Sequence, residues 1–282
     1  MIVPNTLFTV ARGEPRLHEE AFEFFESNGF VVLQGMLRED ELRELRRIVY
    51  DLASEEFREK RGHNYGHNMQ RVWNLLDKHD TFHDLILSPQ LLAWMDRIFD
   101  RPTPHQKYFL SSFQANILKP GAQPLQLHID TPVPEPLPPW VLKANSIWVL
   151  DPFTECNGAT EVIPGSHRRT RKPNRSDPED HHGIVKVIAP AGAVILTHGA
   201  LWHRSGANTS DGTRAVLLGS FAASFAREIA SEEDIVRCVS AATMDRFSVE
   251  LKTLVGYFHG LKPGGGFEPR ASASNAKSRM GE

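Results

Sequence analysis

The chain has 282 residues, of which 40% are hydrophobic and 24% are charged. This composition supplies enough apolar material for a sizeable core and excludes a chain that is disordered throughout. Lys and Arg total 32 against 35 Asp and Glu, a formal net charge of -3. Such a chain has no general electrostatic attraction to nucleic acid or to anionic membranes.

No apolar run approaches the roughly 20 residues that cross a bilayer, and the first residues show no cationic, apolar leader. The last residues carry no peroxisomal Ser-Lys-Leu address, so we expect a cytoplasmic protein. Its two cysteines, Cys156 and Cys238, are too few for a disulfide framework or a four-thiolate zinc site. The 13 histidines exceed what composition alone suggests and make a metal site worth seeking.

The first hundred residues predict helices around one short strand. Apolar residues recur at helical spacing over 15–27, 38–60 and 80–99, with charged residues on the opposite faces. Between the first two helices, residues 30–33 form a β-branched and aromatic stretch that is typical of a strand.

After Pro102-Thr103-Pro104 the chain changes to short apolar stretches separated by Gly and Pro. This pattern predicts a β-sandwich or barrel, with the preceding helices packed outside the sheet. The candidate strands are 109–118, 125–130, 143–150, 159–163, 184–188, 193–197, 201–205 and 214–222.

The C-terminal part returns to helical spacing over 231–256. The tail, 263–282, is rich in Gly, Ser and Ala and holds almost no core-forming residues, so we expect it to be disordered. The remaining residues, 1–262, are predicted to form one domain.

The string QPLQLHIDTP, residues 123–132, carries a metal-binding pattern. His128 and Asp130 are two apart in a predicted strand, so their side chains share one face. A third ligand can come from residues 192–208, as His203 or His198. Two histidines and one carboxylate form the facial triad of non-haem Fe(II) oxygenases, which leaves coordination positions open for a co-substrate and dioxygen.

Arg214 follows His203 by eleven residues, across a Gly-Ala-Asn-Thr-Ser-Asp-Gly turn. This spacing suits a hairpin that returns the arginine to the mouth of the site. A guanidinium there can bind a carboxylate through two parallel hydrogen bonds.

Three motifs occur in order: HID at 128–130, NGATEVIPGSH at 157–167 and LWHRSGANTSDGTR at 201–214. Together with NGFVVLQGML at 28–37, they resemble the phytanoyl-CoA dioxygenase family of Fe(II)/2-oxoglutarate oxygenases over about residues 18–225. The resemblance implies a mainly β protein with flanking α-helices and a double-stranded β-helix core of the jelly-roll, cupin-like kind.

The resemblance also implies roles for individual residues. The iron ligands would be His128, Asp130 and His203. Arg214 would pair with the distal carboxylate of 2-oxoglutarate. Three further side chains match positions that contact the same co-substrate, with the last two as alternatives for one position: Trp148, Asn116 and Gln114.

The implied activity uses Fe(II), 2-oxoglutarate and O2 and releases succinate and CO2. Its expected outcome is hydroxylation of a small-molecule metabolite or natural product. The retained Asp130 argues for oxygenation, because related halogenases replace this carboxylate with a small residue. Two other classes stay open: a cupin-like metal enzyme that does not use 2-oxoglutarate, which would not need Arg214, and a catalytically silent ligand-binding barrel.

Three connecting segments are candidates for the substrate pocket. Residues 63–75 are rich in His, Asn and aromatic residues and form either a surface loop or a cover of the entrance. The proline-rich segment 131–140 follows the metal ligands and is expected to rim the pocket. Residues 166–182 run basic and then acidic, as in a solvated loop or a lid that attracts an anionic substrate.

Overall fold

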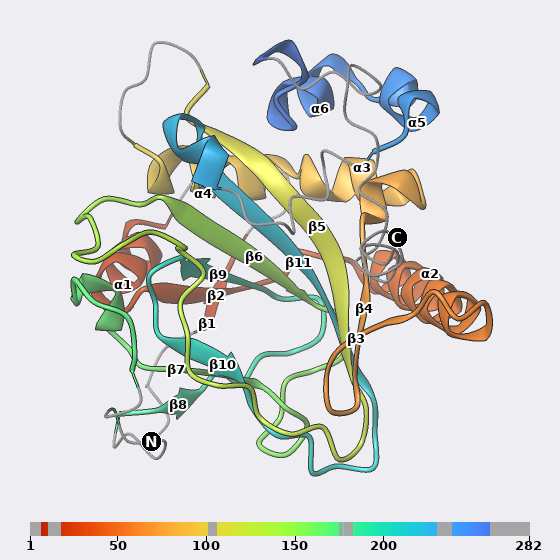
Figure 1. The fold of residues 1–282 in the computed structure, drawn as a ribbon, viewed down its shortest axis with the longest axis horizontal. Helices are drawn as coiled ribbons and strands as arrows, with labels where there is room; N and C mark the ends of the chain where they lie inside the picture. The colour runs from red at the N-terminus through yellow and green to blue at the C-terminus, as the bar shows by residue number, and fades with distance from the viewer. Residues whose placement is uncertain are drawn as a thin grey trace, which may run out of the picture.

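A computed structural model describes residues 7–10, 18–100, 106–174, 177, 183–229 and 239–259. It contains two β-sheets, with the helices packed along the large one (Figure 1). The strands are β1 (Leu7–Thr9), β2 (Phe30–Gln34), β3 (His63–Gly66), β4 (Met69–Val72), β5 (Tyr108–Leu118), β6 (Lys143–Val149), β7 (Thr160–Val162), β8 (Val185–Lys186), β9 (Val194–His198), β10 (His203–Ser205) and β11 (Arg214–Ala223). The helices are α1 (Glu19–Asn28), α2 (Glu39–Arg58), α3 (Thr81–Ile86), α4 (Pro89–Ile98), α5 (Ala241–Arg246) and α6 (Val249–Leu254).

The large sheet has the strand order β1-β2-β9-β6-β11-β5-β4-β3, and the small sheet has the order β10-β7-β8. One buried core lies between the large sheet and the helices and includes Phe25, Trp94 and Leu217. A second core joins the two sheets, with Ile195 of β9 and Val185 of β8 among its members. The layers therefore run helices, large sheet, small sheet, which confirms the expected mainly β architecture with flanking helices.

Strand β6 lies at the centre of the large sheet. It pairs antiparallel with both β9 and β11, so Asn145 stands opposite Thr197 on one side and Ser220 on the other. Hydrogen bonds to both neighbouring strands fix the backbone of β6. The side chains of β6 alternate between the helix layer and the interior between the two sheets. Asn145 and Ile147 face the interior cavity described below.

Seven of the eight strands expected between 109 and 222 are present. The exception is 125–130, where the prediction of a strand was wrong. This segment is extended but forms no regular ladder. Its single β-bridge joins His128 and His203, whose backbone N–H groups each donate to the other's carbonyl at 3.0 Å, and the N–H groups of Leu125 and Asp130 donate to Ser205 and Gly199. Pro124 and Pro132 flank the segment and lack the N–H groups that a longer ladder needs.

The single helix expected over 80–99 is two helices, α3 and α4. Pro89 is the first residue of α4. Proline has no N–H to continue the preceding helix and disfavours the helical conformation of Ser88, so the chain must break and start again there.

The C-terminal prediction is met only in part. Within 239–259, the expected long helix is divided into α5 and α6, and Ser248 caps the second by accepting a hydrogen bond from the Leu251 N–H. The rest of the predicted helix and the tail 263–282 lie outside the described residues. None of the described helices combines the length and the apolar character that crossing a bilayer requires.

The segment 63–75 contains a β-hairpin, not a plain loop. Strand β4 pairs with β5, which places Arg71 opposite Asn116, and β3 continues the sheet at its edge. The hairpin sequence is too polar to predict a strand by itself, and the exposed edge of β5 supplies its pairing partner. The hairpin brings Tyr65 and Arg71 over the interior cavity.

Candidate metal centre and co-substrate cavity

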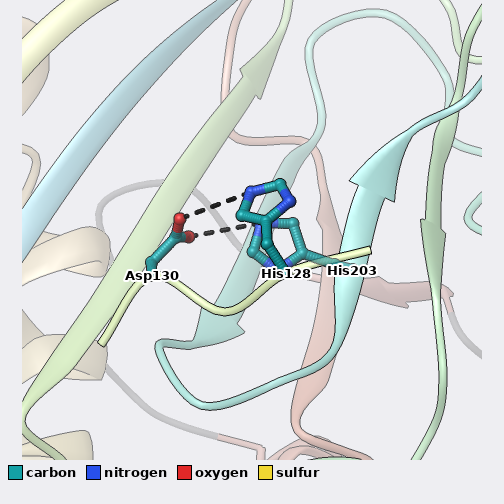
Figure 2. Close-up of side chains that lie close together, drawn as sticks. All are labelled: His128, Asp130 and His203. Carbon is teal, nitrogen blue, oxygen red and sulfur yellow. Dashed lines mark ion pairs between the residues drawn. The ribbon is translucent and has the colours of Figure 1, made fainter. Parts of the chain in front are cut away.

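Three side chains with metal-binding atoms converge beside the start of β10 (Figure 2). His128 and Asp130 come from the extended segment that bridges to β10, and His203 is the first residue of β10. His128 Nε2 lies 3.7 Å from Asp130 Oδ1, and His203 Nε2 lies 3.3 Å from Asp130 Oδ2. The three ligand atoms lie within 4.8 Å of one another, so one metal ion can contact all three.

The orientation of both histidines suits metal binding. The Nδ1 atom of His128 lies 2.8 Å from the carbonyl of Gln126, and that of His203 lies 2.9 Å from the carbonyl of Leu201. Since a carbonyl oxygen only accepts, each Nδ1–H is the donor. In a neutral ring this leaves the Nε2 lone pair directed at the centre, which is the arrangement that metal-binding histidines use.

Asp130 and His203 shift each other's protonation. Burial alone would raise the pKa of Asp130, but His203 and His128 outweigh it and hold that pKa below its usual range. Burial also disfavours the charged form of His203, yet Asp130 raises the pKa of His203 above its ordinary value. A metal ion at this centre therefore competes with a proton on His203 and displaces it on binding.

Asn145 holds the carboxylate of Asp130. Its Nδ2 donates to Asp130 Oδ2 at 2.6 Å, and the side chain of Asn145 is 3% exposed. A longer contact of 3.4 Å joins the same amide to Thr197 Oγ1. The sequence motifs do not identify Asn145, because it lies fifteen residues from Asp130 and meets it only through the sheet pairing of β6.

Replacing Asn145 with Leu is expected to weaken metal binding about 10- to 100-fold, the usual effect of removing a hydrogen bond to a metal ligand. Isothermal titration with Co(II) would measure this loss. Ser146→Ala is the matched control, since Ser146 is equally buried on the same strand and its hydroxyl makes no hydrogen bond with the described residues. Equal Co(II) affinity in Asn145→Leu and Ser146→Ala would contradict the expectation.

Arg214, the first residue of β11, is 2% exposed in the same cavity. Its Nη2 donates to the carbonyl of Gly158, and its guanidinium lies 4.5 Å from the ring centroid of Phe153. Its Nε has no hydrogen-bond partner among the described residues. Burial lowers the pKa of Arg214 to about 10, against the opposing effect of Tyr65 and Asp151, so the side chain stays cationic at neutral pH. A buried cation with an unused donor fits a carboxylate ligand.

The cavity has a volume of about 250 Å³ and connects the three metal-binding side chains with Arg214. Gln114 and Asn116, the two alternatives on β5, both line it. Gln114 Oε1 is buried without a hydrogen-bond partner among the described residues, whereas Asn116 Oδ1 accepts from Arg71 Nε at 3.0 Å. Tyr65 and Arg71, from the β3–β4 hairpin, also line the cavity. The composition of residues 63–75 indicated a role for this segment but did not identify these two residues.

The structure contradicts the predicted contact between Trp148 and 2-oxoglutarate. Trp148 is fully buried and belongs to the core between the large sheet and the helices. Side chains of a strand alternate between faces, so Asn145 and Ile147 point into the cavity and Trp148 points away from it.

His198, the other candidate for the third ligand, lies outside the metal centre. Its Nδ1 accepts a hydrogen bond from the backbone N–H of Ala200 at 3.0 Å, and its ring is 5.0 Å from that of His167. His167 in turn contacts the carbonyl of Glu26 through Nε2 at 3.0 Å. The geometry therefore brings His203, and not His198, together with His128 and Asp130.

His198 should make the protein sensitive to acid. Burial, aided by His167, lowers the pKa of His198 to about 3. In the unfolded chain this histidine binds a proton near pH 6.5, whereas in the folded chain it stays neutral. Its contribution to the stability of the folded state is therefore complete above pH 6.5 and is lost as the pH falls towards the pKa in the folded chain. We expect the free energy of unfolding to drop by about 1–2 kcal/mol between pH 6.5 and 5 from this group.

Urea denaturation at several pH values would measure the effect as the difference between the unaltered protein and His198→Asn. Asparagine can place an oxygen where His198 Nδ1 accepts its hydrogen bond, but it does not titrate. Parallel pH dependences for the two proteins would rule this contribution out.

Comparison with known proteins supports a single family. Residues 25–216 match the family described as Phytanoyl-CoA dioxygenase (PhyH). "Dioxygenase af480" of Aspergillus fumigatus is 33% identical over 162 residues, which are 56% of this chain and 50% of that protein. The match thus spans half the length of this relative. "Dioxygenase FUM3" of Gibberella moniliformis is 27% identical over 256 residues, which are 85% of this chain and 82% of that protein.

A solved structure shares the fold. HygX from Streptomyces hygroscopicus, crystallised with nickel and 2-oxoglutarate bound, superposes with a TM-score of 0.64 at 16% identity, over 74% of this chain and 89% of that one. The two facing sheets of the chain thus have the double-stranded β-helix arrangement that the motifs led us to expect.

Proposed function

The chain belongs to the phytanoyl-CoA dioxygenase family of Fe(II)- and 2-oxoglutarate-dependent enzymes, and from this premise we propose that it hydroxylates a small-molecule metabolite or natural product. One observation carries the proposal. A set of two histidines and one carboxylate shares a cavity of about 250 Å³ with a buried arginine that has an unused donor.

Each residue has a distinct task in this proposal. His128, Asp130 and His203 hold Fe(II), and Asn145 keeps the Asp130 carboxylate in place. Arg214 binds the distal carboxylate of 2-oxoglutarate and thereby orients the co-substrate towards the metal.

The other walls of the cavity assist the co-substrate site. Tyr65 closes it from the hairpin, and its buried hydroxyl has no partner among the described residues. Gln114 offers a further polar contact. Gln114 and Arg214 are each 2% exposed, which shields the co-substrate end of the cavity from water, whereas the side chain of His128 at the metal end is 41% exposed.

When bound, Fe(II) and 2-oxoglutarate supply the oxidising power of the reaction. In balance, the substrate C–H, O2 and 2-oxoglutarate give the substrate C–OH, succinate and CO2. The protein contributes positioning and charge.

The cupin-like alternative without 2-oxoglutarate is not favoured. The family match argues against it, and such an enzyme would have no use for Arg214 buried beside the metal centre. HygX, with its bound 2-oxoglutarate, and a relative named "Multifunctional dioxygenase prhA" support the same choice.

The direct test is succinate formation from 2-oxoglutarate by the Fe(II)-loaded protein in air, followed by chromatography. We expect slow turnover even without substrate, and its loss in His128→Ala. Succinate formation that persists in His128→Ala, or its absence in protein with confirmed iron loading and bound 2-oxoglutarate, would refute the proposal.

A further inference from the structure

A second and larger cavity, of about 530 Å³, is lined by a separate set of residues that shares none with the cavity at the metal centre. Two of the segments predicted to shape the substrate pocket meet at its wall: the N–H of Leu137 donates to the carbonyl of Thr170 at 2.7 Å, and the N–H of Lys172 donates to Glu135 Oε1 at 2.6 Å. The ends of α1 and α4 form the opposite wall. We call this space the loop cavity.

The loop cavity carries an excess of positive charge. Four cationic side chains line it against two carboxylates, an excess of two, and the six are Arg97, Lys107, Arg168, Arg169, Glu26 and Asp100. Arg97 lies 3.5 Å from Glu19, whereas neither Arg168 nor Arg169 forms an ion pair with a described carboxylate: Arg168 donates to the carbonyl of Ser27, and Asp177 acts on Arg169 only at longer range. A cavity with this excess of cationic side chains favours an anion.

Arg169 is held in a defined position. Its guanidinium lies 4.6 Å from the ring centroid of Trp202, which is fully buried. A cation stacked on an indole loses little further freedom when it binds a ligand. Because Trp202 directly precedes the metal-binding His203, this contact also connects the loop cavity to the metal centre.

Aromatic side chains line the loop cavity next to the cations. Trp140 is 40% exposed and Phe225 is 58% exposed, two of the few large apolar side chains that reach solvent among the described residues. Phe22 and Phe99 are buried in the wall behind them. Exposed aromatic rings beside unpaired cations are complementary to a flat apolar group that bears a negative charge.

The loop cavity shares backbone with the metal ligands. The segment that contains Leu137 and Trp140 follows Asp130 directly, and the N–H of Asp130 donates to the carbonyl of Gly199 at 2.8 Å. The lining of the loop cavity is thus covalently continuous with the segment that carries two of the three metal-binding side chains, and His198, which also lines it, directly precedes Gly199.

We propose that the loop cavity binds an aromatic organic anion, and that this anion is the substrate oxidised at the metal centre. The second half of the proposal rests on the proposed function; the first half does not. In the proposed complex, Arg168 and Arg169 bind the anionic group of the ligand, and Trp140 and Phe225 contact its flat apolar portion.

The binding test compares two probes of the same shape, 2-naphthoate and its uncharged amide, 2-naphthamide. Calorimetric titration of the metal-free protein is expected to show naphthoate binding about 10-fold tighter than the amide, since a hydrogen bond to a charged group is stronger than a neutral one. Arg169→Gln should remove most of this preference and leave the amide affinity within about twofold. Trp140→Ala should weaken both probes by a few-fold.

Two controls secure the assignment. Arg47→Gln removes an exposed cation of α2 that pairs with Glu44 and Asp51 far from the loop cavity, and it should leave both affinities unchanged. Excess 2-oxoglutarate should not displace naphthoate, which shows that the probe is not in the Arg214 cavity. Should Arg169→Gln unfold, Arg169→Lys tests the same contact, with a smaller expected loss.

Equal affinity for the two probes, or unchanged naphthoate affinity in a folded Arg169 variant, would overturn the anion site. The role as substrate site is tested separately, in the anaerobic protein loaded with Fe(II) and 2-oxoglutarate. Naphthoate should shift the visible charge-transfer band, and Arg169→Gln should abolish that shift. Saturable binding without a shift would overturn the substrate assignment, while the absence of any band would count against the proposed function and leave the metal-free titration intact.

Discussion

Arg214→Gln is expected to weaken 2-oxoglutarate binding by at least about 30-fold. Arg214 is 2% exposed, and removing one partner of a buried, hydrogen-bonded charge pair costs about 2–5 kcal/mol, where each 1.4 kcal/mol is tenfold in affinity. Titration of 2-oxoglutarate into the anaerobic Fe(II) protein, followed by the visible charge-transfer band, measures the loss. Affinity for Co(II) without co-substrate should stay within about twofold, since Arg214 makes no contact with the metal-binding side chains.

Two further variants sharpen this result. Arg214→Lys keeps the charge but loses the planar fork, so we expect an intermediate loss. Arg246→Gln, which removes an exposed arginine paired with Asp80, should behave as the unaltered protein. If Arg214→Gln binds 2-oxoglutarate normally, the co-substrate carboxylate is held by other residues, and Arg71, which lines the same cavity, becomes the first alternative.

The sequence is informative where chemistry is local. His128 and Asp130 are two residues apart, and the backbone hydrogen bonds of their segment to His203 and Gly199 bring the three side chains together. The convergence of the three candidate ligands was therefore predictable although the segment 125–130 forms no regular strand. An extended backbone with hydrogen bonds at Leu125, His128 and Asp130 is enough.

Residues that meet through sheet pairing were harder to find. Asn145 reaches Asp130 because β6 pairs with β9 and β11, and no spacing in the sequence reports that pairing. For Trp148 the sequence predicted a contact that the fold does not form. The motif match placed the residue correctly on β6, but it did not show which face of the strand the side chain occupies. Tyr65 and Arg71 lie on a polar hairpin whose strands form only against the edge of β5.

The loop cavity shows the same limit at longer range. Its walls include 137–141, 167–170 and residues of α1 and α4, and Phe22 and Thr170 lie 148 residues apart in the sequence. The charge of residues 166–182 was evident from the sequence and left an anionic ligand as one of two alternatives. The convergence of the loops depends on the tertiary packing and was not evident.

His203→Asn and His198→Asn form a matched pair that should separate the two histidines the sequence left open. Asparagine can replace the Nδ1 contact of either residue, which is to the carbonyl of Leu201 for His203 and to the N–H of Ala200 for His198. Asparagine has no atom that can replace Nε2. Of these two histidines, only His203 directs its Nε2 at Asp130, at 3.3 Å.

We therefore expect His203→Asn to weaken Co(II) binding more than about 100-fold, beyond the 10- to 100-fold that loss of a hydrogen bond to a metal ligand causes. His198→Asn should keep Co(II) affinity within about threefold at pH 7.5, where His198 is neutral in the folded and the unfolded chain. Because each substitution removes one imidazole and keeps its backbone contact, a general loss of packing would lower the two affinities alike. A large loss in His198→Asn together with a small one in His203→Asn would move the third ligand to His198 and with it the position of the metal.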